Sequence, residues 1–325
     1  MCTALCLKVN DFYFGRNLDL EYDFGQEVVI TPRNYPWQWR ATEQINKPYY
    51  AMIGMANITD NYPLYAEAVN EHGLAMSSLN FPGNAVYQEC QEGSLNLTPF
   101  EIIPYFLAHF KSVAESRESL EKLNLIAEKY NDKMPLTPLH FILADEHDCV
   151  VIEPVAEGIK IYENPYGVLT NNPPFPFQIA NLELYANLSA QNTPNSFAAN
   201  LQPKPFGQGI GAFGLPGDSS PPSRFVKTCF HKLNSVCEPD ELSAVSQFFH
   251  ILDAVSFVRG SVVTEAGLND ITTYSCAVNC RTGDYYFKTY DNHQICCVSL
   301  RKVDLDGSEL NNYTLPKGEA VNHLN

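Results

Sequence analysis

The second residue of the chain is a cysteine, and its place next to Met1 could give it unusual chemistry. Removal of Met1, which a small second residue generally permits, would leave Cys2 with a free α-amine beside its thiol. An α-amine has a pKa of about 7.7–8.0, against about 8.5 for a cysteine thiol, so it could serve as the base that activates its own side chain. A second-position cysteine is also often incidental. Cys2 is therefore a candidate nucleophile only if further residues that could activate it lie nearby.

Arg16 and Asp19, within the motif FGRNLD, could be such activating residues. Strand-like segments 3–9 and 12–16 flank a polar turn, and their hairpin would return Arg16 and Asp19 to Cys2. A cation there favours the thiolate, and two pK units of such help are worth about 2.7 kcal/mol. A carboxylate could hold the α-amine by accepting its hydrogen bonds. An exposed arginine–aspartate pair on a hairpin, which contributes little, is an equally good interpretation of the same residues.

Two asparagines, Asn80 and Asn171, each stand where an apolar strand-like segment ends shortly before a proline. Side-chain amides at strand ends can donate to an oxyanion, and one such donor is typically worth about 2.7–4 kcal/mol in kcat. Asparagine before proline is also ordinary turn chemistry. Without other information, the turn interpretation is favoured for both residues.

The elements that would position these residues form alternating blocks of strands and helices. A capping box at Thr98–Glu101 predicts a helix start, and apolar spacing predicts further helices at 112–123, 223–233 and 240–258. The expected strands are 3–9, 12–16, 28–31, 51–56, 65–69, 74–79, 141–144, 150–154, 159–162, 168–170, 275–279, 285–289 and 294–299. This order predicts two sheets covered by helices, in one domain over 1–325, and not a parallel βαβ sheet. The Gly- and Pro-rich residues 201–222 predict a long surface loop.

Composition narrows the classes of protein. With 45% hydrophobic and 18% charged residues the 325-residue chain is that of a folded globule, and a net charge of −16 without a basic stripe disfavours nucleic acid as a partner. No segment approaches the roughly 18 uninterrupted apolar residues of a membrane span, and the N-terminus lacks signal-peptide features. We therefore expect a cytoplasmic protein whose ten cysteines are mostly reduced. The cysteine and histidine spacings suggest no metal site.

Taken together, these residues resemble the choloylglycine hydrolase family, the bile salt hydrolases and penicillin V acylases within the N-terminal nucleophile hydrolases. Each matching motif is weak alone, but the set occurs in the family order over nearly the whole chain. The motifs are MCT (1–3), FGRNLD (14–19), ITPRN (30–34), NYPLY (61–65), LNFP (79–82), VLTNNP (168–173), GLPGD (214–218), SRFV (223–226), QFFHIL (247–252) and YD (290–291).

The resemblance implies that Cys2 is the nucleophile and its α-amine the base. Asp19 would orient the amine, and Arg16 would lie against the sulfur. Asn80 and Asn171, with a backbone N–H, would surround the oxyanion. The thiolate would attack an amide carbonyl, the amine would protonate the leaving group, and water would hydrolyse the thioester.

The resemblance further implies that Arg224 adds positive charge to the site, that the fold is a four-layer αββα sandwich of the α+β class, and that the assembly is a homotetramer. It implies no metal or cofactor. An apolar acyl group needs an apolar cleft, and Leu20, Tyr22 and Phe24, which follow Asp19, are candidates for its wall. Membership of the protein core is an equal alternative for these three residues.

Asn80 favours one branch of the family, because bile salt hydrolases resemble this sequence in having Asn there, where typical penicillin V acylases have Tyr. The chain departs from many bile salt hydrolases at Ser77-Ser78, where they have Ala-Gly, which leaves the shape of the pocket open. The resulting hypothesis is cleavage of the amide between a bile acid and glycine or taurine. The alternatives are a penicillin V or other N-acyl amidase, and a noncatalytic binding protein on the same scaffold.

Overall fold

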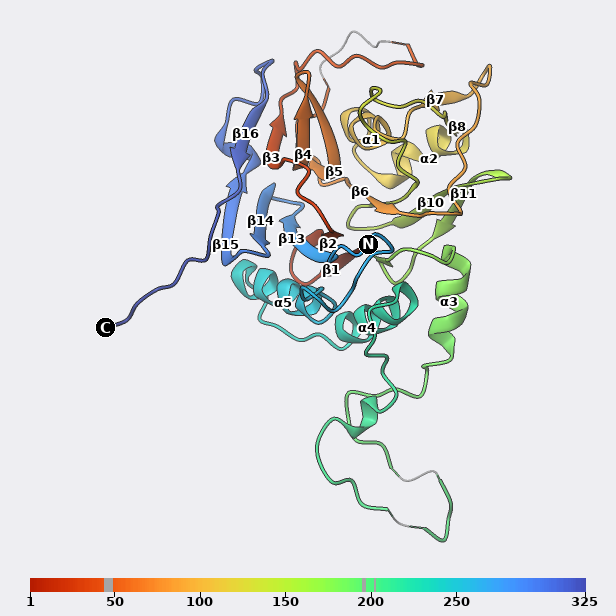
Figure 1. Cartoon of the computed structure of the whole chain (residues 1–325), viewed down its shortest axis with the longest axis vertical. Helices are drawn as coiled ribbons and strands as arrows, with labels where there is room; N and C mark the ends of the chain where they lie inside the picture. Colours follow the sequence, from red (N-terminus) through yellow and green to blue (C-terminus); the bar gives the residue numbers. More distant parts are fainter. Residues whose placement is uncertain (44–48, 195–196, 202) are drawn as a thin grey trace.

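Two stacked antiparallel sheets form the centre of the molecule, and helices cover the outer face of each (Figure 1). The computed structural model describes residues 1–43, 49–194, 197–201 and 203–325. The first sheet has the order β12 (Val168–Leu169), β1 (Cys2–Lys8), β2 (Phe12–Leu20), β13 (Ile271–Asn279), β14 (Asp284–Thr289), β15 (Asn292–Ser299). The second has the order β11 (Gly158–Glu163), β10 (Cys149–Val155), β9 (Leu139–Ala144), β6 (Ala75–Asn80), β5 (Tyr62–Asn70), β4 (Met52–Thr59), β3 (Gln26–Thr31), β16 (Asn311–Thr314).

The helices lie in two outer layers. The helix α1 (Ile102–His109) packs on β5 and β6 of the eight-stranded sheet, and α2 (Val113–Glu121) joins the same apolar cluster. On the other side, α4 (Pro221–Leu233) packs on β1 and β12, and α5 (Glu241–Asp253) packs on β13. A further helix, α3 (Phe175–Glu183), lies against α4. The remaining elements are β7 (Leu95–Leu97), β8 (Leu123–Leu125), η1 (Ile210–Ala212) and η2 (Leu300–Lys302). The layers are those of the expected αββα sandwich.

Two apolar clusters hold the four layers together. One fills the space between the sheets and continues under α4 and α5, and the other lies between the eight-stranded sheet and α1 with α2. Strands buried on both faces explain why the sheet centres read as nearly continuous apolar runs, as in β10. Cys2, at the start of β1, belongs to the first cluster and is 4% exposed.

The expected strands are all present, with shifted ends. Strand β2 runs on to Leu20, four residues beyond the expected end, because β13 pairs with it as far as Ile271 opposite Leu20. The first helix begins at Ile102, four residues after Thr98. Of the two capping-box hydrogen bonds, the one from the Thr98 amide to Glu101 Oε2 is present at 2.9 Å, whereas the Glu101 amide donates to the Thr98 carbonyl and not to its hydroxyl. The segment expected to be helical over 240–258 ends at Asp253 in turn bonds.

The predicted surface loop is largely confirmed. In its described part, η1 is the one regular turn before α4 begins at Pro221, and Gln202 lies outside the described residues. This loop belongs to a longer projection, which we call the arm and which consists of the described residues within 184–220. The arm extends away from the sandwich below α3 and α4 (Figure 1).

Candidate active site

The β1–β2 hairpin brings three predicted site residues together, as expected. Cys2 pairs with Leu18 and Ala4 pairs with Arg16. Because directly paired residues point to the same face of a sheet, Cys2 and Arg16 both face the eight-stranded sheet. Asp19, one residue beyond Leu18, points to the opposite face, where its carboxylate accepts a hydrogen bond from the Thr272 hydroxyl at 2.6 Å.

The Arg16 guanidinium lies buried between the two sheets, with 1% of the residue exposed. Its Nη1 donates to Ser77 Oγ at 3.0 Å and to the Ser78 carbonyl at 2.5 Å, and Glu67 Oε2 lies 3.8 Å away. Burial opposes the charge, yet the neighbouring Cys2, Tyr274 and Glu67 raise the pKa of Arg16 above its ordinary value. The protein therefore keeps a fixed cation on the sulfur side of β1.

A carboxylate and an ammonium group meet on the other side of this strand. The Met1 amine donates to the Asp19 carbonyl at 2.5 Å and pairs with Asp270 Oδ2 at 3.3 Å. Burial raises the pKa of the Asp19 carboxyl, while the terminal amine and Arg224 act to lower it. One Asp19 oxygen, Oδ2, is buried without a hydrogen-bond partner in the described part of the chain. An acceptor is thus available beside the N-terminus.

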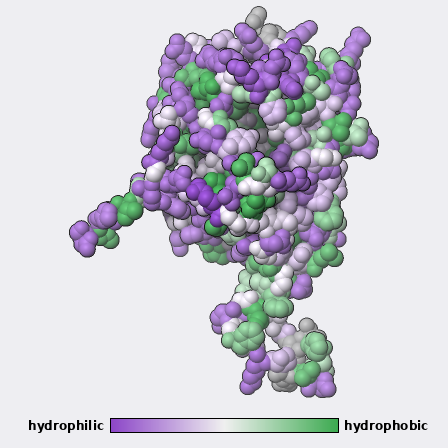
Figure 2. Space-filling view, viewed as in Figure 1, coloured by the Kyte–Doolittle hydropathy of each residue, from purple (hydrophilic) through white to green (hydrophobic). Residues whose placement is uncertain are grey.

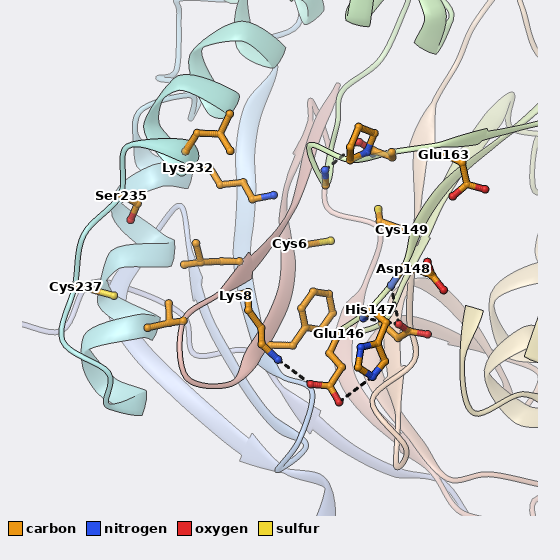
Figure 3. Close-up of a pocket in the computed structure, with 18 of the residues that line it drawn as sticks. Cys6, Lys8, Glu146, His147, Asp148, Cys149, Glu163, Lys232, Ser235 and Cys237 are labelled. Carbon is orange, nitrogen blue, oxygen red and sulfur yellow. Dashed lines mark hydrogen bonds and ion pairs between the residues drawn. The ribbon is translucent and has the colours of Figure 1, made fainter. Parts of the chain in front are cut away.

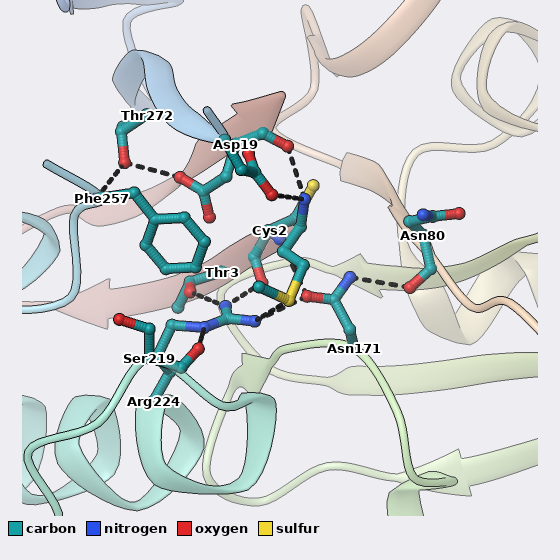
Figure 4. Close-up of polar contacts among 11 residues, drawn as sticks. Cys2, Thr3, Asp19, Asn80, Asn171, Ser219, Arg224, Phe257 and Thr272 are labelled. Atoms are coloured by element: carbon teal, nitrogen blue, oxygen red, sulfur yellow. Dashed lines mark hydrogen bonds and ion pairs between the residues drawn. The ribbon is translucent and has the colours of Figure 1, made fainter. Parts of the chain in front are cut away.

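Asn171 is the residue that joins the parts of the site (Figure 4). Its Oδ1 accepts from the Cys2 backbone nitrogen at 2.9 Å and from Arg224 Nη2 at 2.8 Å, and its Nδ2 donates to the Asn80 carbonyl at 2.7 Å. The amide oxygen of Asn171 thus faces Cys2, and its nitrogen is occupied by a carbonyl. In this arrangement Asn171 orients the Cys2 nitrogen.

Asn80 ends β6 and lies across Asn171 from Cys2 (Figure 4). Its Oδ1 is buried with no hydrogen-bond partner among the described residues. Because the oxygen and nitrogen of an amide exchange by a flip of the side chain, the Asn80 amide can present a donor at the same place. Of the two asparagines, Asn80 is the one whose side-chain amide makes no hydrogen bond within the described chain.

Arg224 reaches Cys2 from α4 and is 1% exposed. Its Nη1 donates to the Cys2 carbonyl at 2.5 Å and to Thr3 Oγ1 at 2.6 Å. Burial lowers the pKa of Arg224, while Asp19 and Cys2 act to raise it. The helix α4 is thereby tied to the first two residues of β1, so Arg224 positions the end of the strand as well as adding charge.

The candidates for the acyl wall lie just past these residues. Leu20 and Phe24 are partly buried and pack against the cluster between the sheets, whereas the Tyr22 side chain is 56% exposed. Their position after Asp19 keeps them near the site, and their role in binding stays a prediction.

Two polar residues near the amine were not anticipated from the sequence, Asp270 and Thr272. Both come from the start of β13, whose pairing with β2 places Thr272 opposite Asp19. No local motif marks them, because only this long-range strand pairing brings them to Asp19. An acidic residue directly before a strand is the one available signal, and it is a weak one.

A cavity of about 770 Å³ lies away from these residues (Figure 3). Its lining includes Cys6, Lys8, Asp145, Cys149 and Lys232 and none of the predicted site residues. A strand rises about 3.3 Å per residue, so Cys6 stands roughly 13 Å along β1 from Cys2. The convergence of charged and amide groups, and not cavity size, marks the site.

The described residues contain no group of three histidine, cysteine, aspartate or glutamate side chains arranged to hold a metal ion. The ten cysteines are all free thiols. No helix among the described residues has the length and apolar character needed to cross a bilayer.

Comparison with known proteins gives concordant relatives. A family model described as linear amide C-N hydrolases, choloylglycine hydrolase family, matches residues 2–313. The bile salt hydrolase/transferase of Lactiplantibacillus plantarum is 44% identical over 315 residues, covering 97% of each chain. The bile salt hydrolase/transferase of Clostridium perfringens is 36% identical over 329 residues, covering 100% of each.

Solved structures show the same fold. The crystal structure of the C2A mutant of the conjugated bile acid hydrolase from Clostridium perfringens matches with a TM-score of 0.90 at 34% identity, covering 100% of both chains. A penicillin V acylase from Agrobacterium tumefaciens matches with a TM-score of 0.73 at 19% identity, covering 96% of this chain and 90% of that one. The second likeness is one of fold alone.

Proposed function

Because the chain belongs to the choloylglycine hydrolase family of linear amide C–N hydrolases, we propose that it cleaves the amide joining a bile acid to glycine or taurine, with Cys2 as the nucleophile. The observation that carries this proposal is the convergence of Arg16, Asp19, Asn171 and Arg224 on the first residues of β1. The names of the relatives at 44% and 36% identity support the bile salt as substrate class.

Removal of Met1 converts the Cys2 amide nitrogen into an α-amine in the same place. The Asn171 oxygen, now 2.9 Å from that nitrogen, remains an acceptor for it, and Asp19 Oδ2 provides a second. The thiol passes its proton to this amine, and Arg16, on the same face of the sheet as the sulfur, stabilises the resulting thiolate. Both acceptors hold the amine so that its lone pair can face the sulfur.

The reaction then proceeds by acyl transfer. The thiolate attacks the amide carbonyl, and the oxyanion receives hydrogen bonds from the Asn80 amide and a backbone N–H, with Asn171 at the same edge. The protonated amine of Cys2 donates to the leaving nitrogen as the C–N bond breaks, which releases glycine or taurine and leaves a thioester. Water attacks the thioester, the amine takes up the water's proton, and the free bile acid leaves while the thiol is regenerated.

We further propose a homotetramer in the cytoplasm. The ten free thiols support a reducing compartment. The arm carries large apolar side chains in solvent, among them Phe206 at 95% and Phe213 at 83% exposure, and hydrophobic residues show on the projection in Figure 2. Patches of this kind on a projecting segment are typical of subunit contacts, so the arm is where copies of the chain would meet.

The test compares turnover of glycocholate, taurocholate and penicillin V by the wild-type protein, Cys2→Ala and Cys6→Ala, together with the intact masses. Cys6 is a matched control because it lies on the same face of β1 and is equally buried. We expect a mature mass without Met1, turnover of both bile salts above that of penicillin V, loss of turnover in Cys2→Ala and retention in Cys6→Ala. Preferred turnover of penicillin V would identify an acylase instead.

Full turnover by Cys2→Ala, or by a protein that keeps Met1, would disprove the mechanism. Binding of bile salts without turnover by the mature wild-type protein would indicate a noncatalytic protein.

A further inference from the structure

The mechanism leaves one fully buried ionisable pair unused, His140 on β9 and Glu153 on β10. Both residues are 0% exposed, and His140 Nδ1 lies 3.2 Å from Glu153 Oε1. A buried ionisable pair is costly to desolvate, and Glu153 Oε2 makes no hydrogen bond among the described residues, so the pair is kept at a cost in stability. The groups that meet the pair therefore indicate what it does.

The imidazole holds the residue before Asn171. His140 Nε2 lies 2.8 Å from the Thr170 carbonyl oxygen. A carbonyl only accepts, so Nε2 carries the hydrogen and donates it, while Nδ1 faces Glu153 Oε1. The Thr170 carbonyl is thus fixed from inside the eight-stranded sheet.

The same ring holds the residue after Asn80. The Phe81 ring stacks on the His140 ring, with centroids 4.3 Å apart and planes 6° apart. The neighbouring strands β6 and β9 place Leu79 opposite His140, so the stack lies next to the strand end that carries Asn80. One imidazole therefore contacts the chain neighbours of both asparagines of the site.

Glu153 fixes the other end of the Asn171 segment. Its Oε1 also accepts from the Phe175 backbone nitrogen at 2.9 Å, at the first residue of α3. The hydrogen bonds of His140 to Thr170 and of Glu153 to Phe175 thus fix the two ends of residues 170–175. Between these two anchors lies Asn171, whose Nδ2 is bonded to the Asn80 carbonyl.

We propose that His140 and Glu153 are positioning residues for the hydrolysis, which set the separation of Asn80 and Asn171 and thereby the geometry that receives the oxyanion. This inference rests on the proposed function. The pair reaches the site through Thr170, Phe81 and Phe175 and makes no hydrogen bond to Cys2 among the described residues, so its loss should act through the positions of the two asparagines. Because Asn171 also accepts from the Cys2 nitrogen, alkylation of Cys2 should slow as well, but by less than kcat, since Arg16 still favours the thiolate.

Two substitutions separate the two contacts of the ring. His140→Phe keeps an aromatic ring to stack on Phe81 but removes the donor to Thr170. His140→Gln keeps a donor near the position of Nε2 but removes the stack. We expect kcat to fall about 100-fold in His140→Phe and about 10-fold in His140→Gln, the scale on which an ångström of misplacement acts.

A third variant tests the other anchor. Glu153→Gln keeps an acceptor for the Phe175 nitrogen and removes the charge, and we expect it to lose about 10-fold in kcat. His147→Gln is the matched control, because this histidine lies on the turn between the same two strands with its side chain 78% exposed. We expect it to keep the wild-type kcat.

The readouts are kcat, KM, the rate of Cys2 alkylation by iodoacetamide and the fraction of folded protein. We expect KM to stay within about twofold of wild type while kcat falls, and the alkylation rate to fall by less than kcat, since thiolate formation also depends on Arg16. An unchanged kcat per folded molecule in His140→Gln and Glu153→Gln would overturn the inference, and so would an alkylation rate that falls in parallel with kcat.

If His140→Phe does not fold, His140→Gln and Glu153→Gln provide the test, since both keep a polar side chain at the buried position. Their kcat per folded molecule is then compared with that of the wild-type protein. Cys2→Ala distinguishes the two levels of the proposal. Turnover by Cys2→Ala would disprove the proposed function. If Cys2→Ala is inactive but the His140 and Glu153 variants keep the wild-type kcat, only the positioning role is disproved.

Discussion

Two guanidinium groups approach Cys2 from opposite faces of its strand. Arg16 comes from β2 on the face between the sheets, and Arg224 comes from α4 on the helix side. Each has a buried carboxylate nearby, Glu67 for Arg16 and Asp19 for Arg224. Only the Arg16 side also bears the sulfur, so we expect the two cations to have different tasks, with Arg16 favouring the thiolate and Arg224 holding the strand end.

Substitution of Arg16 should therefore slow thiol chemistry at Cys2. We expect Arg16→Gln to lower the rate of alkylation of Cys2 at neutral pH by about 10- to 100-fold, because the thiolate loses its cation. The variant also leaves the Glu67 carboxylate without its partner, which costs about 3–5 kcal/mol of unfolding free energy. The double variant Arg16→Gln/Glu67→Gln should recover stability without recovering reactivity. A wild-type alkylation rate in the folded double variant would contradict this role.

Asp19 should contribute oppositely to activity and to stability. Burial raises its pKa above the ordinary 3.8. A carboxyl with a raised pKa stabilises the fold fully below its ordinary pKa and loses that contribution as the pH rises through the folded value. We expect Asp19→Asn to lose turnover, because the amine loses an acceptor, while its unfolding free energy relative to wild type rises as the pH increases from the ordinary carboxyl pKa toward neutral pH. Urea unfolding across that range measures the difference, and a constant or shrinking difference would contradict the assignment.

Among the site residues, the sequence predicted correctly the proximity of those that a single hairpin brings together. Cys2, Arg16 and Asp19 are joined by a short turn, so alternation along two strands was enough to place them together. The hydrogen bonds of Asn171 were not predictable, because the orientation of its amide depends on Arg224 and on the Asn80 carbonyl, from distant parts of the chain. The chemical roles of Cys2, Arg16, Asp19 and Asn171 remain predictions.

Among the elements, the contact of β2 with β13 leaves no space at Gly15. A Cβ built there would lie 2.0 Å from the Cys276 carbonyl oxygen, which is backbone and cannot move aside. We expect Gly15→Ala to separate the two strands, to lower the unfolding free energy by about 1–3 kcal/mol or more, and to reduce turnover through displacement of Arg16, the next residue. Gly207→Ala, where nothing lies within 4 Å, is the control and should behave as wild type. Normal turnover by Gly15→Ala would show that the strands can part without loss.

The elements missed from the sequence are those with the least periodic signal. The helix α3 follows two prolines and contains a third, which concealed its helical pattern. The strands β7, β8 and β16 have only three or four residues each, too few for alternation to show. All of the long strands were recognised, since alternation persists through them, but the ends of strands such as β2 depend on partners far away in the sequence.

For the whole molecule, the arm is the main feature outside the sandwich. We expect the wild-type protein to sediment as a tetramer and the double variant Phe206→Asp/Phe213→Asp to sediment as smaller species. Charged side chains in place of these exposed rings would oppose an apolar contact between subunits. Sedimentation velocity of both proteins measures the change. The control is Tyr22→Asp, an exposed aromatic outside the arm. An unchanged sedimentation coefficient for the double variant would exclude the arm as the contact.

The shortness of β12 has a consequence for how such a protein could diverge. It pairs with β1 only at Ala4 and Leu5, so Cys2 and Thr3 have a strand neighbour on one side and irregular chain on the other. Cys2 is thus held by the sheet on one side and, on the other, by the Asn171 side chain from that irregular segment. We therefore expect relatives that take other leaving groups or acyl chains to differ outside the sheets and beyond Asn171, with Cys2 and its hydrogen-bonding partners retained.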